Sequence, residues 1–396
     1  MKLLLCTVPD GPLKMQREPL IPRKAIKCKD NENPTFPMGI LRVLAAVQES
    51  GYDGEIYDLN NLRHSDEQLI ENFKKIQPDV VGLSGPLSHC YPNLKNMAKI
   101  IRELFPKAWI VIGGHISGSA NVVLRKTDSD IIVVGDGEIS FVKLLKYIET
   151  NPDRKKFDHE SLKQIQGLAY IDQNDKFMMT GYGPQINGTD MEYPDFAKWE
   201  KGLKEYGGSE DLINEVFEDA TNLGNIFALN VEKQHQRDDI LKIHKELQGK
   251  KVGRIQTSKG CVAKCTFCQR ATKGYRVFGQ NFMEHRIMEL KEKYNVGVLI
   301  VDDENFGSNR KQGYECAKLM KKHGIYWSSA GARAASISVE DLKFYKEHNM
   351  LAIRYGIESG SQTILDIMEK KTTKEQVYEQ IEACTRIIKL CRGIKS

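Results

Sequence analysis

The sequence predicts an α/β protein in which a doubly wound parallel sheet is followed by a partial barrel of β/α units. Short β-rich runs alternate with helical patterns over residues 1–150, the alternation stops over 151–250, and it resumes over 251–396. A chain of 396 residues is long enough for two domains that each bury an apolar core. We therefore expect two α/β domains joined by a hairpin and a helical linker.

In the N-terminal domain, five β-rich runs alternate with helix candidates. In the helix candidate 37–50, Ile40, Leu44 and Val47 fall on one face, and Gly51 follows as a stop signal. Parallel strands need crossover connections, so helices are expected on both faces of the sheet. The predicted strands are Lys2–Val8, Gly54–Leu59, Asp79–Ser84, Trp109–Gly113 and Asp130–Val134.

Small residues follow three of these strands. Ligands of doubly wound sheets bind beyond the carboxyl ends of the strands, and small residues let the backbone approach a bulky ligand. The alternative is that strand-to-helix turns need glycine for a positive φ whatever they bind, and that His115 only stabilises its turn. The candidate ligand-binding residues are Ser84, Gly113, Gly114, His115, Gly135 and Gly137.

Residues 151–250 carry no motif to which we assign chemistry. A hairpin is predicted over 167–180 and a linker at 193–195. Residues 196–250 have an amphipathic helical pattern with many charges, which predicts a solvated spacer or a cover for a neighbouring surface.

The alternation that resumes after 250 predicts four β/α units. The last helix is preceded by a capping-box pattern, Thr372 to Glu375. The predicted strands are Arg254–Ser258, Val298–Asp302, Tyr326–Ala330 and Leu351–Gly356. The predicted helices are Met283–Tyr294, Tyr314–Lys322, Val339–His348 and Lys374–Leu390.

Composition and charge give no support to several functional classes. Apolar residues make up 40% of the chain and charged residues 28%, and no uncharged apolar run is long enough to predict a membrane span. The net charge is only +5, and the basic residues form no dense stripe of the kind that binds nucleic acid. The apolar run Leu3–Leu5 is too short for a signal peptide. We expect a cytoplasmic protein.

Three cysteines, Cys261, Cys265 and Cys268, lie within eight residues after a predicted strand. Four-iron clusters normally take four thiolates, so a loop with three leaves one iron open for a small chelator such as S-adenosylmethionine. A structural zinc site is the alternative. It would need a fourth ligand, such as Cys316 or a distant histidine, and no second Cys or His pair has finger-like spacing.

The spacing C-x3-C-x-aromatic-C, with Phe267 as the aromatic residue, resembles the signature of the radical S-adenosylmethionine (radical SAM) superfamily. Three further matches follow in order: the turn 302–306 is similar to a D-D-x-x-F turn, Arg333 follows the third strand, and 356–361 follows the fourth. The resemblance covers roughly residues 250 to 396. It implies a reduced four-iron cluster that cleaves S-adenosylmethionine to methionine and a 5′-deoxyadenosyl radical, with electrons from a flavodoxin or ferredoxin.

The resemblance also implies roles for individual residues. The three cysteines would hold the cluster, Phe267 would pack near the adenine, and Glu358 and Ser359 would contact the methionine or ribose. Arg333 and Gly356 are further candidates for cofactor binding. The candidate catalytic residues are Asp302, Asp303 and Glu358. The two aspartates have an alternative role as an acidic turn or helix cap.

The order of domains resembles the cobalamin-binding branch of this superfamily, whose first domain is flavodoxin-like. The D-x-H-x-x-G motif of other cobalamin domains is absent, because the first turn runs Pro9-Asp10-Gly11-Pro12. Bound cobalamin would therefore lack a lower ligand of that type. The branch implies a cobalamin-dependent enzyme that methylates or rearranges an unreactive carbon.

Two alternatives remain. Methylthiotransferases place three cysteines for a second cluster in their first domain, and Cys6, Cys28 and Cys90 are available here, although none lies in a matching motif. The other alternative is a catalytically weak or regulatory cluster-binding protein. Family members usually have six β/α units and only four are predicted here, so we expect a C-terminal truncation, or a chain that needs a partner or a second copy.

Overall fold

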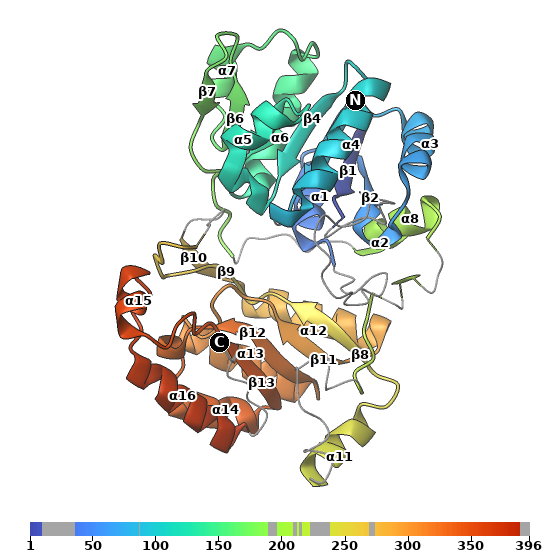
Figure 1. Ribbon diagram of the computed structural model, residues 1–396. Helices are drawn as coiled ribbons and strands as arrows, with labels where there is room; N and C mark the ends of the chain where they lie inside the picture. The colour runs from blue at the N-terminus through green and yellow to red at the C-terminus, as the bar shows by residue number, and fades with distance from the viewer. Residues whose placement is uncertain are drawn as a thin grey trace, which may run out of the picture. The chain divides into compact units, whose positions relative to one another are not determined.

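The computed structural model describes residues 1–9, 36–86, 88–188, 196–208, 212–213, 216–221, 238–268 and 274–388 (Figure 1). The chain divides into two compact units. The first comprises 1–186, 192–216 and 269–272, and the second comprises 187–191, 217–268 and 273–396. Among the described residues, no helix is long and apolar enough to cross a membrane.

The sheet of the first unit has, within the described residues, the strand order β2-β1-β3-β4-β5-β6-β7. Strands β1 to β5 run parallel, and their order is that of a flavodoxin-like doubly wound sheet, as predicted. The hairpin that we placed in the connecting region extends this sheet, because β6 pairs antiparallel with β5 and β7 with β6. The strands are β1 (Leu3–Thr7), β2 (Gly54–Asp58), β3 (Val80–Ser84), β4 (Trp109–Gly113), β5 (Ile131–Val133), β6 (Leu168–Ile171) and β7 (Phe177–Met179).

Helices cover both faces of this sheet (Figure 1). Apolar side chains of α3, α4 and α5 form one buried core with alternate strand residues such as Leu4 and Ile110. On the other face α1 contacts α6, and a Cβ at Gly82 would lie 3.7 Å from the Phe141 ring of α6. The helices are α1 (Met38–Glu49), α2 (Leu59–Leu62), α3 (Asp66–Ile76), α4 (Tyr91–Leu104), α5 (Ala120–Lys126), α6 (Gly137–Thr150) and α7 (His159–Lys163), with 3-10 turns η1 (Ser88–Cys90) and η2 (His115–Ser119).

Of the two roles predicted for this region, a solvated spacer or a cover, helix α8 (Phe196–Glu205) has the second, because it covers the edge strand β2. The indole of Trp199 is fully buried and donates a 2.6 Å hydrogen bond to the buried carboxylate of Asp58, at the end of β2. Thr7 of β1 donates a second hydrogen bond of 2.6 Å to the same carboxylate. A Cβ at Gly202 would collide with the carbonyl oxygen of Ile56, so this close approach requires glycine.

The continuous amphipathic helix predicted over 196–250 is wrong for part of its length. Residues 216–221 are not helical, and Asp219 forms a β-bridge with Lys251. Another helix, α11, begins at Asp238 and ends at Glu246. Within the described residues, the charge-rich sequence with helical periodicity therefore contains separate helices and an extended segment, because tertiary pairing overrides a weak helical pattern.

The described part of the second unit contains a parallel sheet in the order β13-β12-β11-β8, in agreement with the predicted partial barrel. The short antiparallel strands β9 and β10 flank the cysteine motif and were not predicted. The strands are β8 (Lys251–Ile255), β9 (Ser258–Gly260), β10 (Tyr275–Val277), β11 (Val296–Val301), β12 (Tyr326–Ala332) and β13 (Met350–Tyr355). The helices are α12 (Gln280–Tyr294), α13 (Arg310–Lys322), α14 (Val339–Glu347), α15 (Gln362–Ile367) and α16 (Lys374–Ile387), with the 3-10 turn η4 (Ala334–Ser336).

The capping box of the last helix lies one residue later than predicted. Thr373, not Thr372, is the N-cap, and its hydroxyl accepts a hydrogen bond from the Gln376 backbone at 3.2 Å. The Gln376 side chain accepts from the Thr373 backbone at 3.0 Å. Thr372 is instead buried, and its hydroxyl accepts a 3.5 Å hydrogen bond from Nη2 of Arg333.

Candidate functional site

The three cysteines of the motif lie on the loop that follows β9. All three are reduced cysteines; Cys261 and Cys265 are partly buried and Cys268 is exposed. The loop is held at its start by a 3.1 Å hydrogen bond from the Cys261 backbone to the Gly274 carbonyl. Within it, the Cys268 backbone donates to the Cys265 carbonyl at 3.2 Å. The motif is therefore an accessible loop closed at its base by the β9–β10 pair.

The donor set of this loop fits a four-iron cluster, because three reduced cysteines within eight residues leave a fourth coordination position for another ligand. The thiols are not drawn together beforehand: among the described residues, no group of three His, Cys, Asp or Glu side chains is positioned to hold a metal ion. Cys316, the fourth ligand considered for zinc, lies fully buried on α13. Burial raises the pKa of its thiol, which disfavours the thiolate that a metal needs.

An acidic turn after β11 holds the segment that leads into the cysteine loop. Asp303 is buried, and its two carboxylate oxygens accept four hydrogen bonds of 2.6 to 3.0 Å from the backbone and hydroxyl groups of Thr257 and Ser258. The next residue, Glu304, accepts a 3.1 Å hydrogen bond from the Gly260 backbone. Burial raises the pKa of Asp303, and the hydrogen bonds from Thr257 and Ser258 act in the opposite direction.

The neighbouring carboxylate, Asp302, has a different environment. Its two oxygens accept hydrogen bonds of 2.8 and 3.0 Å from Nη1 of Arg254 on β8, in a half-exposed ion pair. Asp302 thus fastens β8 to the end of β11, while Asp303 fastens the loop. The catalytic roles predicted for both residues remain predictions, and Glu304 is a loop contact that the sequence analysis missed.

The second half of the cysteine loop is attached to the segment after α15. The Thr266 backbone donates a 3.0 Å hydrogen bond to the Met368 carbonyl. Nζ of Lys370 lies 5.7 Å from the ring centre of Phe267, which is half exposed. The same ammonium donates a 2.9 Å hydrogen bond to Oε1 of Glu358, after β13. Phe267 and Glu358, predicted from separate motifs, are thus joined by a lysine that no sequence pattern singled out.

Two further residues predicted for this unit, Arg333 and Gly356, lie beside the same segment. Arg333, after β12, donates through Nη2 to the carbonyl oxygen of Lys370 and, at 3.3 Å, to that of Lys371. A Cβ at Gly356 would lie 2.8 Å from Oε1 of Glu358, so glycine leaves room for the ion pair with Lys370. Ser359 is half buried, and its hydroxyl accepts a 3.1 Å hydrogen bond from the Ser361 backbone.

In the first unit, the predicted ligand-binding residues lie at the carboxyl ends of adjacent strands. Ser84 and Gly113 are paired in register as the last residues of β3 and β4. Gly114 has a φ of +90°, and a Cβ there would lie 2.6 Å from the Gly85 carbonyl oxygen, so this glycine serves the turn itself. A Cβ at Gly113 would meet nothing within 4 Å. The open space at Gly113 is therefore the observation that fits a bulky ligand.

The turn after β5 continues this row of small residues. Gly135 has a φ of +89°, and Gly137 begins helix α6. His115 lies exposed in the 3-10 turn after β4. The small residues fit the broad face of a corrin, because they place little side-chain bulk at three strand ends.

The cysteines considered for a second cluster are poorly suited to it. Cys6 of β1 and Cys90 of η1 are both fully buried in the core beneath α3 and α4. Burial raises the pKa of the Cys6 thiol. Cys28 lies outside the described residues.

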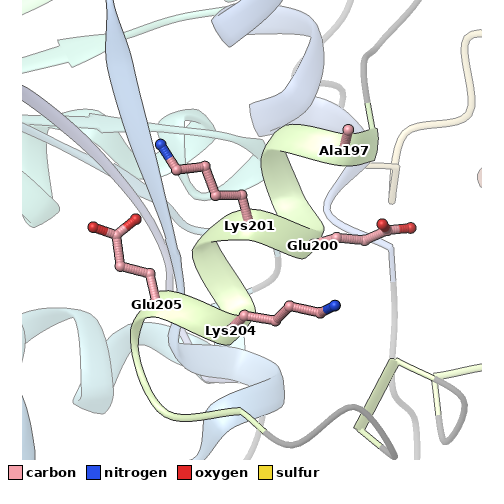
Figure 2. A pocket seen from close by; sticks show the side chains of 5 residues that line it. All are labelled: Ala197, Glu200, Lys201, Lys204 and Glu205. Atoms are coloured by element: carbon pink, nitrogen blue, oxygen red, sulfur yellow. The ribbon is translucent and has the colours of Figure 1, made fainter.

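A surface hollow on α8 involves none of the predicted site residues. Figure 2 shows the side chains that line it projecting from the helix in several directions, with charges of both signs. They are Ala197, Glu200, Lys201, Lys204 and Glu205. We assign no chemistry to this hollow.

Comparisons with known proteins match each unit to a domain family. The model of the B12 binding domain matches residues 30–145, and that of the radical SAM superfamily matches residues 255–394. The sequence is 24% identical to cytidylyl-2-hydroxyethylphosphonate methyltransferase of Streptomyces wedmorensis, over 91% of this chain and 67% of the relative. It is 26% identical to anaerobic magnesium-protoporphyrin IX monomethyl ester cyclase of Cereibacter sphaeroides, over 87% of this chain and 50% of the relative.

The fold is also similar to a solved structure, that of the cobalamin-dependent S-adenosylmethionine radical enzyme OxsB with aqua-cobalamin bound. The TM-score is 0.67 at 16% identity, with 98% of this chain and 48% of OxsB covered. The chain thus spans between about half and two thirds of the length of these proteins.

Proposed function

We propose that this chain, which joins a B12 binding domain to a radical SAM domain, methylates or rearranges an unreactive carbon after reductive cleavage of S-adenosylmethionine. Its two domains place it in the cobalamin-binding branch of the radical SAM superfamily. One observation carries the proposal. The loop with the three cysteines lies at the carboxyl ends of a parallel sheet, where barrel active sites are built, and turns after β11 and α15 hold it.

In this proposal Cys261, Cys265 and Cys268 hold the cluster and leave one iron for S-adenosylmethionine. When bound, the cluster supplies the electron that breaks the bond between the sulfonium sulfur and C5′, and cobalamin supplies a carrier for a methyl group. Asp303 and Glu304 fix the entry of the loop through their hydrogen bonds to Ser258 and Gly260. The half-exposed Phe267 ring offers a surface for an adenine.

Cobalamin would bind the first unit beyond strands β3, β4 and β5. Ser84, Gly113, Gly114, Gly135 and Gly137 place small side chains there, and the exposed His115 lies at the rim. The names of two similar proteins, a methyltransferase and a cyclase, support methylation or rearrangement as the outcome. The burial of Cys6 and Cys90 weighs against the methylthiotransferase alternative.

Other parts of the prediction belong to the same proposal. We expect domains at 1–150 and 251–396 with a connecting region between them, a small-molecule substrate, a flavodoxin or ferredoxin as electron donor, and a cytoplasmic location. A partner or second copy for the partial barrel also remains a prediction.

Anaerobic reconstitution with iron, sulfide and hydroxocobalamin tests the function. We expect one four-iron cluster and one cobalamin per chain, and cleavage of S-adenosylmethionine under reducing conditions. Alanine at Cys261, Cys265 or Cys268 should abolish the cluster, while the matched variant Cys316→Ala should keep it. Protein that holds one zinc ion and no iron would refute the proposal.

A further inference from the structure

Lys370 is a buried lysine at the point where three predicted cofactor contacts meet. Its side chain is only 6% exposed, and its ammonium lies between the Glu358 carboxylate and the Phe267 ring. Its backbone carbonyl accepts a hydrogen bond from Arg333. A buried ammonium is costly unless a carboxylate or an aromatic face compensates it, so this lysine depends on both neighbours.

The backbone around this lysine is held in an uncommon conformation. Glu358, Glu369 and Lys371 all have left-handed φ values, of 66°, 49° and 51°, although none is glycine. Such residues persist only where the surrounding contacts over-determine them, and they cluster at binding and catalytic sites. The restraining contacts are the Lys370 ion pair for Glu358 and a bond from Arg333 for Lys371. Glu369 is held by the end of α15, because its backbone donates a 2.9 Å hydrogen bond to the Asp366 carbonyl.

The ion pair leaves part of Glu358 available. Lys370 engages Oε1, while 35% of the Glu358 side chain remains exposed. Phe267 is 50% exposed as well. One buried ammonium therefore restrains an accessible carboxylate on the turn after β13 and an accessible ring on the cysteine loop.

We propose that Lys370 is a positioning residue of the S-adenosylmethionine site, which fixes the Glu358 carboxylate relative to the Phe267 ring without contacting the cofactor. The proposal rests on the proposed function, because it requires that the chain binds S-adenosylmethionine. Without the ammonium, Glu358 loses its anchor and the cofactor meets a carboxylate that has to be reoriented on binding.

The test uses the full chain with its reconstituted cluster. We expect Lys370→Met to raise the Kd for S-adenosylmethionine roughly tenfold, the range lost with a charged hydrogen bond, while iron content stays unchanged. S-adenosylmethionine changes the spin-resonance spectrum of the reduced cluster, and in this variant the change should require a correspondingly higher S-adenosylmethionine concentration. Lys370→Arg, which keeps the charge, should recover most of the affinity. Lys371→Met is the matched control, because this neighbouring side chain is exposed.

A double-mutant cycle identifies the partner. If Lys370 acts through Glu358, the double variant Lys370→Met with Glu358→Gln binds S-adenosylmethionine no more weakly than whichever single variant binds it less tightly. The proposal would be overturned if the effects of the two substitutions on the Kd multiply in the double variant. It would also be overturned if Lys370→Met binds S-adenosylmethionine with wild-type affinity or loses iron. If Lys370→Arg and Lys370→Met bind S-adenosylmethionine equally weakly, the proposal is overturned as well. If the wild-type protein itself holds no cluster or binds no cofactor, the proposed function fails first.

Discussion

Asp303 accepts two hydrogen bonds from Thr257, one from its backbone at 2.7 Å and one from its hydroxyl at 2.6 Å. The two residues are 46 positions apart, at the ends of adjacent parallel strands. Ser258 donates a second pair to the same carboxylate, so both oxygens are engaged below the surface. An acidic residue next to the candidate active site thus has the contacts of a loop anchor.

We expect Asp303→Asn to destabilise the protein and to lower its capacity for iron. The amide replaces one acceptor oxygen by a donor, which leaves buried groups of Thr257 or Ser258 without an acceptor at a cost of about 1–3 kcal/mol. Urea unfolding and iron per chain after reconstitution measure the two effects.

The matched variant is Asp302→Asn. Its ion pair with Arg254 is half exposed, so the free energy of unfolding should fall by about 1 kcal/mol or less. If Asp303→Asn keeps wild-type stability and iron content but loses turnover, the carboxylate takes part in the reaction and the anchor interpretation is wrong.

Glu304 provides a second hold on the same loop. Its side chain accepts the hydrogen bond of Gly260, which directly precedes Cys261. Glu304→Ala should therefore reduce the iron retained after a chelator challenge, whereas Glu304→Gln keeps an acceptor oxygen and should retain more. Equal retention by the two variants would show that this hydrogen bond does not support the loop.

The sequence predicted the features that local pattern determines. Strand-and-helix alternation predicted the doubly wound parallel sheet of the first unit, and spacing alone identified the loop with Cys261. Contacts between distant positions had no such signal. Lys370 lies in a charged stretch that composition would leave in solvent, and Trp199 meets Asp58 across 141 positions. Both depend on how strand ends and helices pack, which no periodicity encodes.

The bond between Trp199 and Asp58 should contribute more than an ordinary indole hydrogen bond. Trp199→Phe removes a donor from a buried carboxylate, so we expect a loss of about 1.5–3 kcal/mol in unfolding free energy. Trp109→Phe is the matched variant in the same unit, because its indole donates to the Pro152 carbonyl at 3.1 Å. A neutral acceptor implies a smaller loss, of about 0.5–1.5 kcal/mol. Equal losses in the two variants would mean that the charge of Asp58 does not strengthen its hydrogen bond with Trp199.

The open space at Gly113 gives the sharpest test of cobalamin binding. Gly113 ends β4, its φ lies outside the left-handed region, and a Cβ there would meet nothing within 4 Å. A Cβ at this position is therefore compatible with the protein's own fold. At Gly114, by contrast, a Cβ would strike the Gly85 carbonyl, so a substitution there would damage the turn whether or not a ligand binds.

We expect Gly113→Val to weaken cobalamin binding roughly tenfold, because overpacking a fitted surface costs about 1–3 kcal/mol. Cobalamin retained after gel filtration, read from its absorbance, measures the loss, and thermal unfolding without cobalamin should match the wild type. The wild-type protein, carried through the same reconstitution and gel filtration, is the reference. If Gly113→Val retains cobalamin as the wild type does, the corrin does not lie against the end of β4, and the ligand site assigned to Ser84 and Gly113 has to be abandoned.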